Sequence, residues 1–343
     1  TVDCELIMDN LILFDFSNLA HRCIHLKQIE AASENPEYAL WHYMVFQAMY
    51  DYVIQTAADF GGTFDVVLAL DSHSGYWRKN IYHPYKGDRL VKKAIDGLDW
   101  ARIYEEFDVL TRNIRECLPW KVISAPKCEA DDVIYTLTQQ HLLEHPEGKV
   151  FVHSGDSDYL QLVQARVFLY NPAKQEYATF PYDTRVNGKD FRYESRDEFL
   201  QYSILTGQGG KDNVYNIKTP TDWSGSRKPG FGIAAAAKAL AHPEGLDAWL
   251  ATNGMADRYE RNRVLIDMRA LPEEYYSEIV QAYQTYPETK IDVQGFIERY
   301  RWPSLASAEA RADIDAVLSA VAEIDVQQPA VVKAEEGSMD FVL

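Results

Sequence analysis

Acidic residues follow the ends of four short apolar runs of this chain, and this recurrence constrains the fold more than any other feature. The runs are residues 11–14 (LILF), 66–70 (VVLAL), 122–123 (VI) and 150–152 (VFV). Short apolar runs rich in β-branched residues, separated by stretches with a helical period, are typical of buried parallel strands. The acids that follow them are Asp15, Asp71, Asp131, Asp132, Asp156 and Asp158.

An alternation of strands and helices also predicts where these acids meet. In an open α/β sheet, functional groups gather beyond the carboxyl ends of the parallel strands. Carboxylates crowded into one crevice repel each other unless protons or hard cations neutralise them, and oxygen ligands favour Mg²⁺ or Mn²⁺. The sequence therefore predicts an α/β fold that carries out metal-dependent chemistry on phosphates.

Composition limits the cellular setting. The 343 residues carry a formal charge of −18, which argues against a nucleic-acid partner, although metal ions and a local basic patch can offset it. The four cysteines are not closely paired, which predicts free thiols, and neither a membrane span nor a signal peptide is visible. We expect a soluble monomer in the cytoplasm, which is the host cytoplasm if the chain comes from a phage.

The patterns divide the chain into four parts. Residues 1–10 are predicted as an N-terminal arm, and residues 11–190 as the α/β domain, with a basic arch at about residues 72–100. Residues 191–305 lose the alternation and are predicted as a helical lobe. Residues 306–343 are predicted as a last helix and a flexible tail.

The acid motifs have both a structural and a catalytic interpretation. Glu129, Asp131 and Asp132 begin a predicted helix, where acids also serve as caps. Asp156 and Asp158 lie in a turn, where acids also form local hydrogen bonds. The repeated coincidence with strand ends favours a site with two Mg²⁺ ions about 4 Å apart, which clamp the attacking and leaving oxygens of a phosphoryl displacement.

A basic segment follows the second strand. Residues 76–93 interleave aromatic residues with cations and hold one acid, Asp88. Rings that stack on bases, beside cations that hold phosphates, suit a surface for single strands, although a solvated charged helix has a similar composition. A cation beside an acidic metal cluster can hold the scissile phosphate, which favours function here. The cations are Arg78, Lys79, Lys86, Arg89, Lys92 and Lys93.

Two Gly-rich segments lie in the predicted helical lobe. Asp212 follows the first and is expected to add a carboxylate to the acid cluster. Gly230 and Gly232 precede an alanine-rich helix and follow Arg227 and Lys228. Glycines before a helix allow backbone N–H groups to approach a phosphate of duplex DNA, although a simple turn between helices explains them equally well.

In these stretches the chain resembles the 5′-nuclease family, which includes flap endonucleases, the 5′-exonuclease domains of bacterial polymerases and phage enzymes. Within the family it is most similar to the RNase H group of T-even bacteriophages. The order and spacing of the stretches that match the family are kept from about residue 5 to residue 290. The matching stretches are residues 14–17 (FDFS), Asp71 with residues 74–78 (SGYWR), Tyr85, Lys86 and Arg89, residues 129–132 (EADD), 154–158 (SGDSD), 211–214 (KDNV) and 264–267 (VLID).

The resemblance implies a PIN-like domain with a central parallel sheet and a basic arch, followed by a helical lobe with a helix–three-turn–helix element that grips duplex DNA. It implies that Lys86 and Arg89 contact the scissile phosphate and that Tyr85 stacks on a base. It also implies that Gly230 and Gly232 lie in the element that grips the duplex. The charge pattern adds Arg78, Lys79, Lys92, Lys93, Arg227 and Lys228 as expected DNA contacts. The implied metal-site acids are Asp15, Asp71, Glu129, Asp131, Asp132, Asp156, Asp158 and Asp212.

The chain departs from the family pattern at one point. The family usually has G-D-x-x-D-N where residues 207–213 read GQGGKDN. Gly209 therefore stands at the place of the first Asp of that motif, and one residue is inserted. Either the second ion binds more weakly, or Asp212 alone holds that side of the site.

The implied activity is that of an Mg²⁺-dependent 5′–3′ exonuclease and flap endonuclease with RNase H activity, with Mn²⁺ as a substitute ion. Its substrates are 5′ flaps, nicked or forked duplex and RNA–DNA hybrid, so that it removes RNA primers and flaps in phage DNA replication. Residues 338–343 are similar to terminal peptides that dock on a sliding clamp, although a disordered end is an equal interpretation.

Two rival functions share parts of this pattern. A PIN-type ribonuclease has the acidic cluster but usually lacks the basic arch and the second lobe. A DNA-binding scaffold with a weakened metal site is the non-enzymatic alternative, which Gly209 keeps open. His153, beside the last strand end, is predicted as a packed strand residue and not as a general base.

Overall fold

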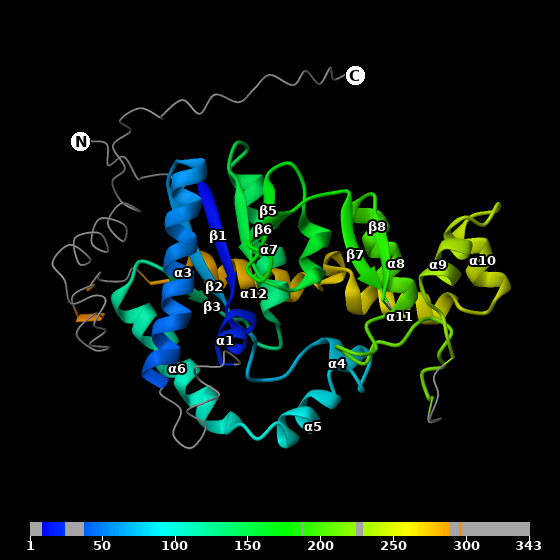
Figure 1. Ribbon diagram of the computed structural model, residues 1–343, viewed down its shortest axis with the longest axis horizontal. Helices are drawn as coiled ribbons and strands as arrows, with labels where there is room; N and C mark the ends of the chain where they lie inside the picture. The colour runs from blue at the N-terminus through cyan, green and yellow to red at the C-terminus, as the bar shows by residue number, and fades with distance from the viewer. Residues whose placement is uncertain are drawn as a thin grey trace.

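A six-stranded sheet forms the centre of the structure, a computed structural model that describes residues 9–24, 38–186, 188–223, 229–287, 292 and 295–296 (Figure 1). The sheet order is β3-β2-β1-β4-β5-β6, with β1 to β5 parallel and β6 antiparallel. The predicted α/β fold with a central parallel sheet is thereby confirmed. The strands are β1 (Asn10–Asp15), β2 (Phe64–Ala69), β3 (Lys121–Ile123), β4 (Val150–His153), β5 (Val167–Asn171) and β6 (Glu176–Ala178).

Helices cover both faces of the sheet, because alternate side chains of a strand point to opposite faces. Ile12 and Phe14 of β1 pack in one core with α1, α3 and α6, whereas Leu11 and Leu13 pack in a second core with α7 and α12. Both faces of β1 are therefore buried, which explains its unbroken apolar sequence. The helices are α1 (Phe16–Ile24), α3 (Tyr38–Phe60), α6 (Trp100–Cys117), α7 (Ala130–Glu144) and α12 (Glu273–Gln284).

The parallel strands end at nearly the same level. In the register of the sheet, Asp15 lies opposite Ala69, Ala69 lies opposite Ile123, and Phe14 lies opposite His153. The loops that leave β1, β2, β3 and β4 therefore emerge together at one edge of the sheet.

A segment between β2 and α6 crosses this edge as an arc. It holds α4 (Arg78–Ile81) and α5 (Asp88–Ile95), and it lies within the residues predicted as a basic arch. Figure 1 shows the segment in cyan, running below the carboxyl ends of the strands, with α4 near α11 (Ala256–Ile266). This path carries its cations close to the strand ends.

The helical part of the chain follows a hairpin that the sequence did not predict. Strands β7 (Tyr182–Val186) and β8 (Lys189–Tyr193) pair antiparallel, so the predicted boundary at residues 190–191 falls inside the hairpin. Within the described ranges, no helix is long and apolar enough to cross a membrane. The later elements are α8 (Arg196–Thr206), α9 (Ile233–Leu240), α10 (Leu246–Thr252) and α11 (Ala256–Ile266), with short 3₁₀ helices η1 (Ser157–Leu162) and η2 (Met268–Ala270).

Candidate active site

Asp15 is the last residue of β1 and is 5% exposed. Its carboxylate accepts from the backbone N–H of Asn18 at 3.0 Å, in the first turn of α1. It also accepts from the hydroxyls of Ser154 at 3.1 Å and Tyr159 at 3.2 Å. These donors are neutral, so they orient the carboxylate without cancelling its charge.

Asp71 and Asp131 join Asp15 in a group that we call the central acids. Asp71 accepts from the Ala130 N–H at 3.0 Å, and the Tyr159 hydroxyl donates to Asp131 at 2.7 Å as well as to Asp15. Burial raises the pKa of Asp71, and burial together with the charge of Asp131 raises the pKa of Asp15 to about 7. A hard cation relieves such repulsion, so the central acids fit Mg²⁺ or Mn²⁺.

Asp132 and Arg78 face each other beside the central acids, which corrects two expectations. Arg78 Nη2 and Nη1 donate to the two carboxylate oxygens of Asp132 at 2.8 and 3.0 Å, and Nη1 donates to Glu129 at 2.7 Å. The Trp77 indole N–H donates to Asp132 at 3.1 Å. Arg78 is 3% exposed, so it does not lie on a DNA-binding surface, and Asp132 joins α4 to α7 instead of facing a metal ion.

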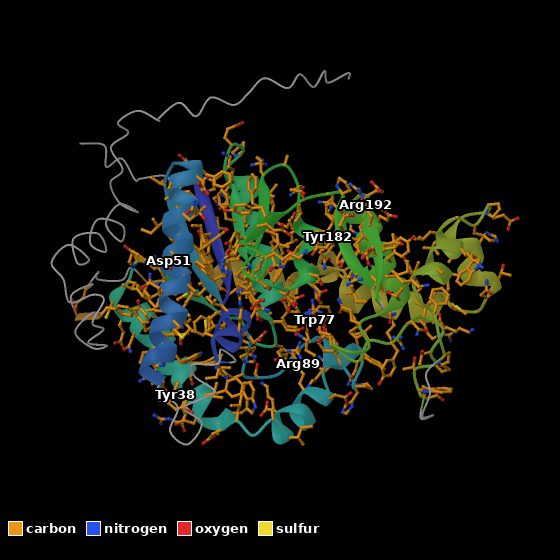
Figure 2. All side chains as sticks on the ribbon, in the orientation of Figure 1. Tyr38, Asp51, Trp77, Arg89, Tyr182 and Arg192 are labelled. Atoms are coloured by element: carbon orange, nitrogen blue, oxygen red, sulfur yellow. The ribbon has the colours of Figure 1, made fainter. Side chains whose placement is uncertain are left out.

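Lys86, Tyr85 and Arg89 tie the arch to buried acids. The Lys86 ammonium contacts Glu129, and the Tyr85 hydroxyl donates to the same carboxylate at 3.0 Å. Although burial opposes it, Lys86 lowers the pKa of Glu129. Arg89, in the first turn of α5, donates from Nη2 to Asp212 at 2.8 Å (Figure 2). Because the Tyr85 ring is buried, it is not open for stacking on a base, which corrects that expectation.

Lys211 lies between Asp156 and Asp158. Its ammonium contacts both carboxylates, at 2.6 Å from Asp158 Oδ2, and Gln208 Nε2 donates to Asp158 Oδ1 at 2.6 Å. The resemblance implied that both acids belong to the metal site, and it linked Asp212 to the second ion. A lysine from the same chain stands between the two acids, so this donor set does not fit a second divalent ion.

A cavity of about 570 Å³ lies between the arch and the strand ends. Acids and cations face each other across it, because its lining includes the central acids, Asp156, Lys86, Arg89, Lys93 and Lys211. In the part of the chain that the structure describes, no group of three or more Asp, Glu, His or Cys side chains is arranged to hold a metal ion by itself. Mg²⁺ keeps several waters and needs only one or two carboxylates, so the central acids suit it through water.

The remaining predicted DNA contacts lie at two places. Lys79 lines a neighbouring cavity of about 320 Å³, together with Lys93. Gly232 immediately precedes α9, and a Cβ added at Gly230 or Gly232 would meet no atom within 4 Å. The Arg227 and Lys228 residues and the Lys92 side chain fall outside what the structure describes.

Sequence reasoning missed several residues of this site. Tyr159 directly follows Asp158, and Lys211 directly precedes Asp212, so adjacency to a predicted acid was the available signal. Gln208 carried no such signal. Only the fold decides which carboxylate each of these side chains contacts.

His153 is a packed residue, in agreement with the prediction. It is 3% exposed, and its ring lies 5.2 Å from the Phe14 ring and 4.7 Å from the Tyr52 ring. Burial lowers its pKa to about 4, so the ring is neutral near neutral pH.

Residues 10–189 match the family described as the 5′-3′ exonuclease, N-terminal resolvase-like domain. The chain belongs to the 5′-3′ exonuclease family. It is therefore a nuclease, and residues 196–300 match the C-terminal domain of T4 RNase H. The family resemblance found in the sequence is confirmed, including its RNase H branch.

Relatives and solved structures agree with this assignment. The ribonuclease H of Enterobacteria phage T4 is 25% identical over 311 residues, which cover 87% of this chain and 95% of that protein. A 5′-3′ exonuclease of Mycoplasmopsis pulmonis (strain UAB CTIP) is 24% identical over 169 residues, which cover 45% of this chain and 52% of that protein. The fold is similar to that of the T5 D15 protein co-crystallised with metal ions, with a TM-score of 0.54 and 15% identity, covering 81% of this chain and 99% of that chain. A bacteriophage T5 flap endonuclease variant in a complex with DNA and metal ions has a TM-score of 0.50 and 15% identity, covering 81% and 98%.

Proposed function

We propose that this nuclease hydrolyses phosphodiester bonds near 5′ ends, as a 5′–3′ exonuclease and flap endonuclease on DNA and as an RNase H on RNA–DNA hybrids. The observation that carries the proposal is the 570 Å³ cavity, in which the central acids face Lys86 and Arg89 of the arch. The names of two relatives, ribonuclease H and 5′-3′ exonuclease, support the same reaction class. In phage DNA replication this activity removes RNA primers and 5′ flaps.

The central acids hold the metal ion in this proposal. Asp15, Asp71 and Asp131 bind Mg²⁺, with Mn²⁺ as a substitute, partly through water, and Asp156 borders the same cavity. A bound Mg²⁺ lowers the pKa of a coordinated water and offsets negative charge at the phosphate. A solved structure of the T5 5′-exonuclease has divalent metal ions (zinc) bound, which supports a divalent ion in this nuclease.

Lys86 and Arg89 hold the scissile phosphate. Each is kept in place by a buried carboxylate, Glu129 for Lys86 and Asp212 for Arg89. Although burial opposes it, Glu129 raises the pKa of Lys86 well above its ordinary value, so its ammonium stays protonated. Cations fixed before the substrate arrives stabilise the charge that develops on the phosphate oxygens without further reorganisation.

The path of the DNA away from the cavity is also part of the proposal. Lys79 and Lys93 line the cavities beside the arch and suit contacts with backbone phosphates. The proposed duplex contacts are Lys92, Arg227, Lys228, Gly230 and Gly232. The proposed clamp contact, residues 338–343, lies outside the described residues.

A substrate panel tests the proposal. The nuclease is incubated with 5′-flap DNA, nicked duplex, RNA–DNA hybrid and single-stranded RNA, in Mg²⁺ or with chelator. We expect cleavage of the first three in Mg²⁺ only, and Asp131→Asn should slow cleavage by roughly 100-fold. Cleavage that survives chelation would contradict the metal-dependent mechanism, and a preference for single-stranded RNA would favour a PIN-type ribonuclease.

Asp65→Asn is the matched control. Asp65 is also a buried acid on a central strand, but it lies near the start of β2 and pairs with Lys121 and Tyr283. The substitution removes one buried charge away from the cavity, so the cleavage rate should stay near that of the wild type.

A further inference from the structure

Asp156 and Asp158 both form an ion pair with a lysine of the same chain, Lys211. Lys211 reaches them from the loop after α8, and its ammonium contacts Asp156 Oδ2 and, at 2.6 Å, Asp158 Oδ2. The other oxygen of each carboxylate also has a donor. Asp156 Oδ1 accepts from the Asp158 N–H at 3.0 Å, and Asp158 Oδ1 accepts from Gln208 Nε2 at 2.6 Å. All four carboxylate oxygens are therefore engaged by this chain.

The loop that carries Lys211 is held in this position by its backbone. Gly207 has a φ of 68°, and a Cβ there would lie 2.4 Å from the Val214 carbonyl oxygen, so only glycine fits. The Gln208 N–H donates to the same carbonyl at 2.6 Å. This turn directs the Gln208 amide to Asp158.

The other residues of this loop bring no further acid to Asp158. A Cβ at Gly209 would lie 3.2 Å from Tyr215 Cδ1, so a side chain there is directed at the Tyr215 ring. Asp212 is 3% exposed and is bonded to Arg89. The loop therefore brings an amide and an ammonium to Asp158, where a second metal site requires carboxylates.

The charge and the donor geometry of the Lys211 ammonium fit its position between Asp156 and Asp158. An ammonium has three N–H donors, and two of them serve the two carboxylates. The Lys211 side chain is 38% exposed and lines the 570 Å³ cavity, so its third donor can reach a phosphate oxygen there. A divalent ion placed between the same acids would be repelled by this charge.

We propose that the Lys211 ammonium is the second cation of this active site, so that the nuclease binds one divalent ion, at the central acids, and not two. The inference rests on the proposed function, because it assumes that the central acids hold an ion. It assigns Lys211 to phosphate contact and Gln208 to the positioning of Asp158.

Counting bound Mn²⁺ by electron paramagnetic resonance tests the inference without relying on cleavage. The full chain is titrated with Mn²⁺, and free Mn²⁺ is measured from its solution signal. We expect one ion per wild-type chain. Asp131→Asn should weaken its binding at least about 10-fold, whereas Asp158→Asn should leave it unchanged.

Variants of Lys211 supply the converse measurement. Lys211→Ala removes the competing charge and should allow a second ion, and combining it with Gln208→Glu should tighten that second ion by adding a carboxylate. Lys211→Arg keeps the charge and should still bind one ion.

Two results would overturn the inference, and they are distinguishable. A wild-type chain that binds two ions, one of which is lost in Asp158→Asn, contradicts it while leaving the proposed function intact. A wild-type chain that binds no ion and cleaves none of the substrates contradicts the proposed function and removes the basis of the inference with it.

Discussion

The Arg78 guanidinium donates to both carboxylate oxygens of Asp132, at 2.8 and 3.0 Å, and both side chains are buried. A cation that looks like a DNA contact in the sequence is therefore part of the packing between α4 and α7. The buried pair fixes the start of the arch relative to the helix that carries Asp131.

Arg78→Ala should lower the free energy of unfolding by about 3–5 kcal/mol, because it leaves the buried charge of Asp132 without its cation and removes one of the two cations that contact Glu129. The measurement is unfolding in urea. Lys79→Ala is the control, since Lys79 is the next residue and is exposed, and it should change stability by less than about 0.5 kcal/mol. Equal losses in the two variants would contradict the assignment.

Tyr159→Phe should weaken Mg²⁺ binding by roughly 10-fold while the fold is retained. The variant removes one hydroxyl that donates to both Asp15 and Asp131, so two central acids lose the group that holds them together. Calorimetric titration with Mg²⁺ measures the effect. Tyr259→Phe removes a hydroxyl that donates to Gln201 in the helical part and should not change the affinity. An unchanged affinity in Tyr159→Phe would remove the proposed role.

Lys86→Ala should slow single-turnover cleavage of a 5′ flap by roughly 100-fold, because a cation fixed at the scissile phosphate is lost. Binding of duplex DNA should change by less than about 2-fold, since one backbone contact contributes little to the total. Lys149→Ala, which removes a lysine ahead of β4, is the control. Weaker binding with an unchanged cleavage rate would show that Lys86 contributes to binding and not to the chemical step.

His153→Gln should flatten the acid dependence of stability. The pKa of His153 is lowered by burial to about 4, against an ordinary value of 6.5, so the unfolded chain takes up the proton first. The neutral His153 ring makes its full contribution to the free energy of unfolding above about pH 6.5. That contribution falls by about 3 kcal/mol in total as the pH falls from about 6.5 to about 4.

The check is urea unfolding of both proteins at about pH 7.5 and about pH 5. The wild type should lose more stability than His153→Gln between the two values. Equal losses would show that His153 does not remain neutral in the folded protein.

The local sequence was sufficient to predict the central sheet and the positions of Asp15 and Asp71 at its edge. The run at residues 11–14 is apolar without interruption because both of its faces are buried, and that pattern is visible in one dimension. Since parallel strands end together, the sequence alone predicts that Asp15 and Asp71 lie close to each other. The β7–β8 hairpin was missed because its strands alternate half-buried and exposed residues without an apolar run.

The roles of the charged and aromatic residues of the arch could not be predicted from the sequence in the same way. Arg78 and Lys86 are both cations of one basic segment, yet Arg78 is buried against Asp132, whereas Lys86 lines the cavity beside Asp71. Tyr85 is an aromatic residue among cations, yet its hydroxyl is bonded to Glu129. These partners are distant in the sequence. Glu129 lies 43 positions from Lys86 and 44 from Tyr85, and Asp132 lies 54 positions from Arg78.

The acids at the strand ends were determined by the sequence itself, because strand period and strand order place them at one edge of any parallel sheet. Which of those acids remain available to a metal ion was decided only by the tertiary structure. Arg78 forms an ion pair with Asp132, and Lys211 forms ion pairs with Asp156 and Asp158. Among the described residues, the central acids accept hydrogen bonds from neutral donors only, and they line the cavity. The physical reason is that a carboxylate's charge can be offset by any cation within a few ångströms, and that distance is a property of the folded chain.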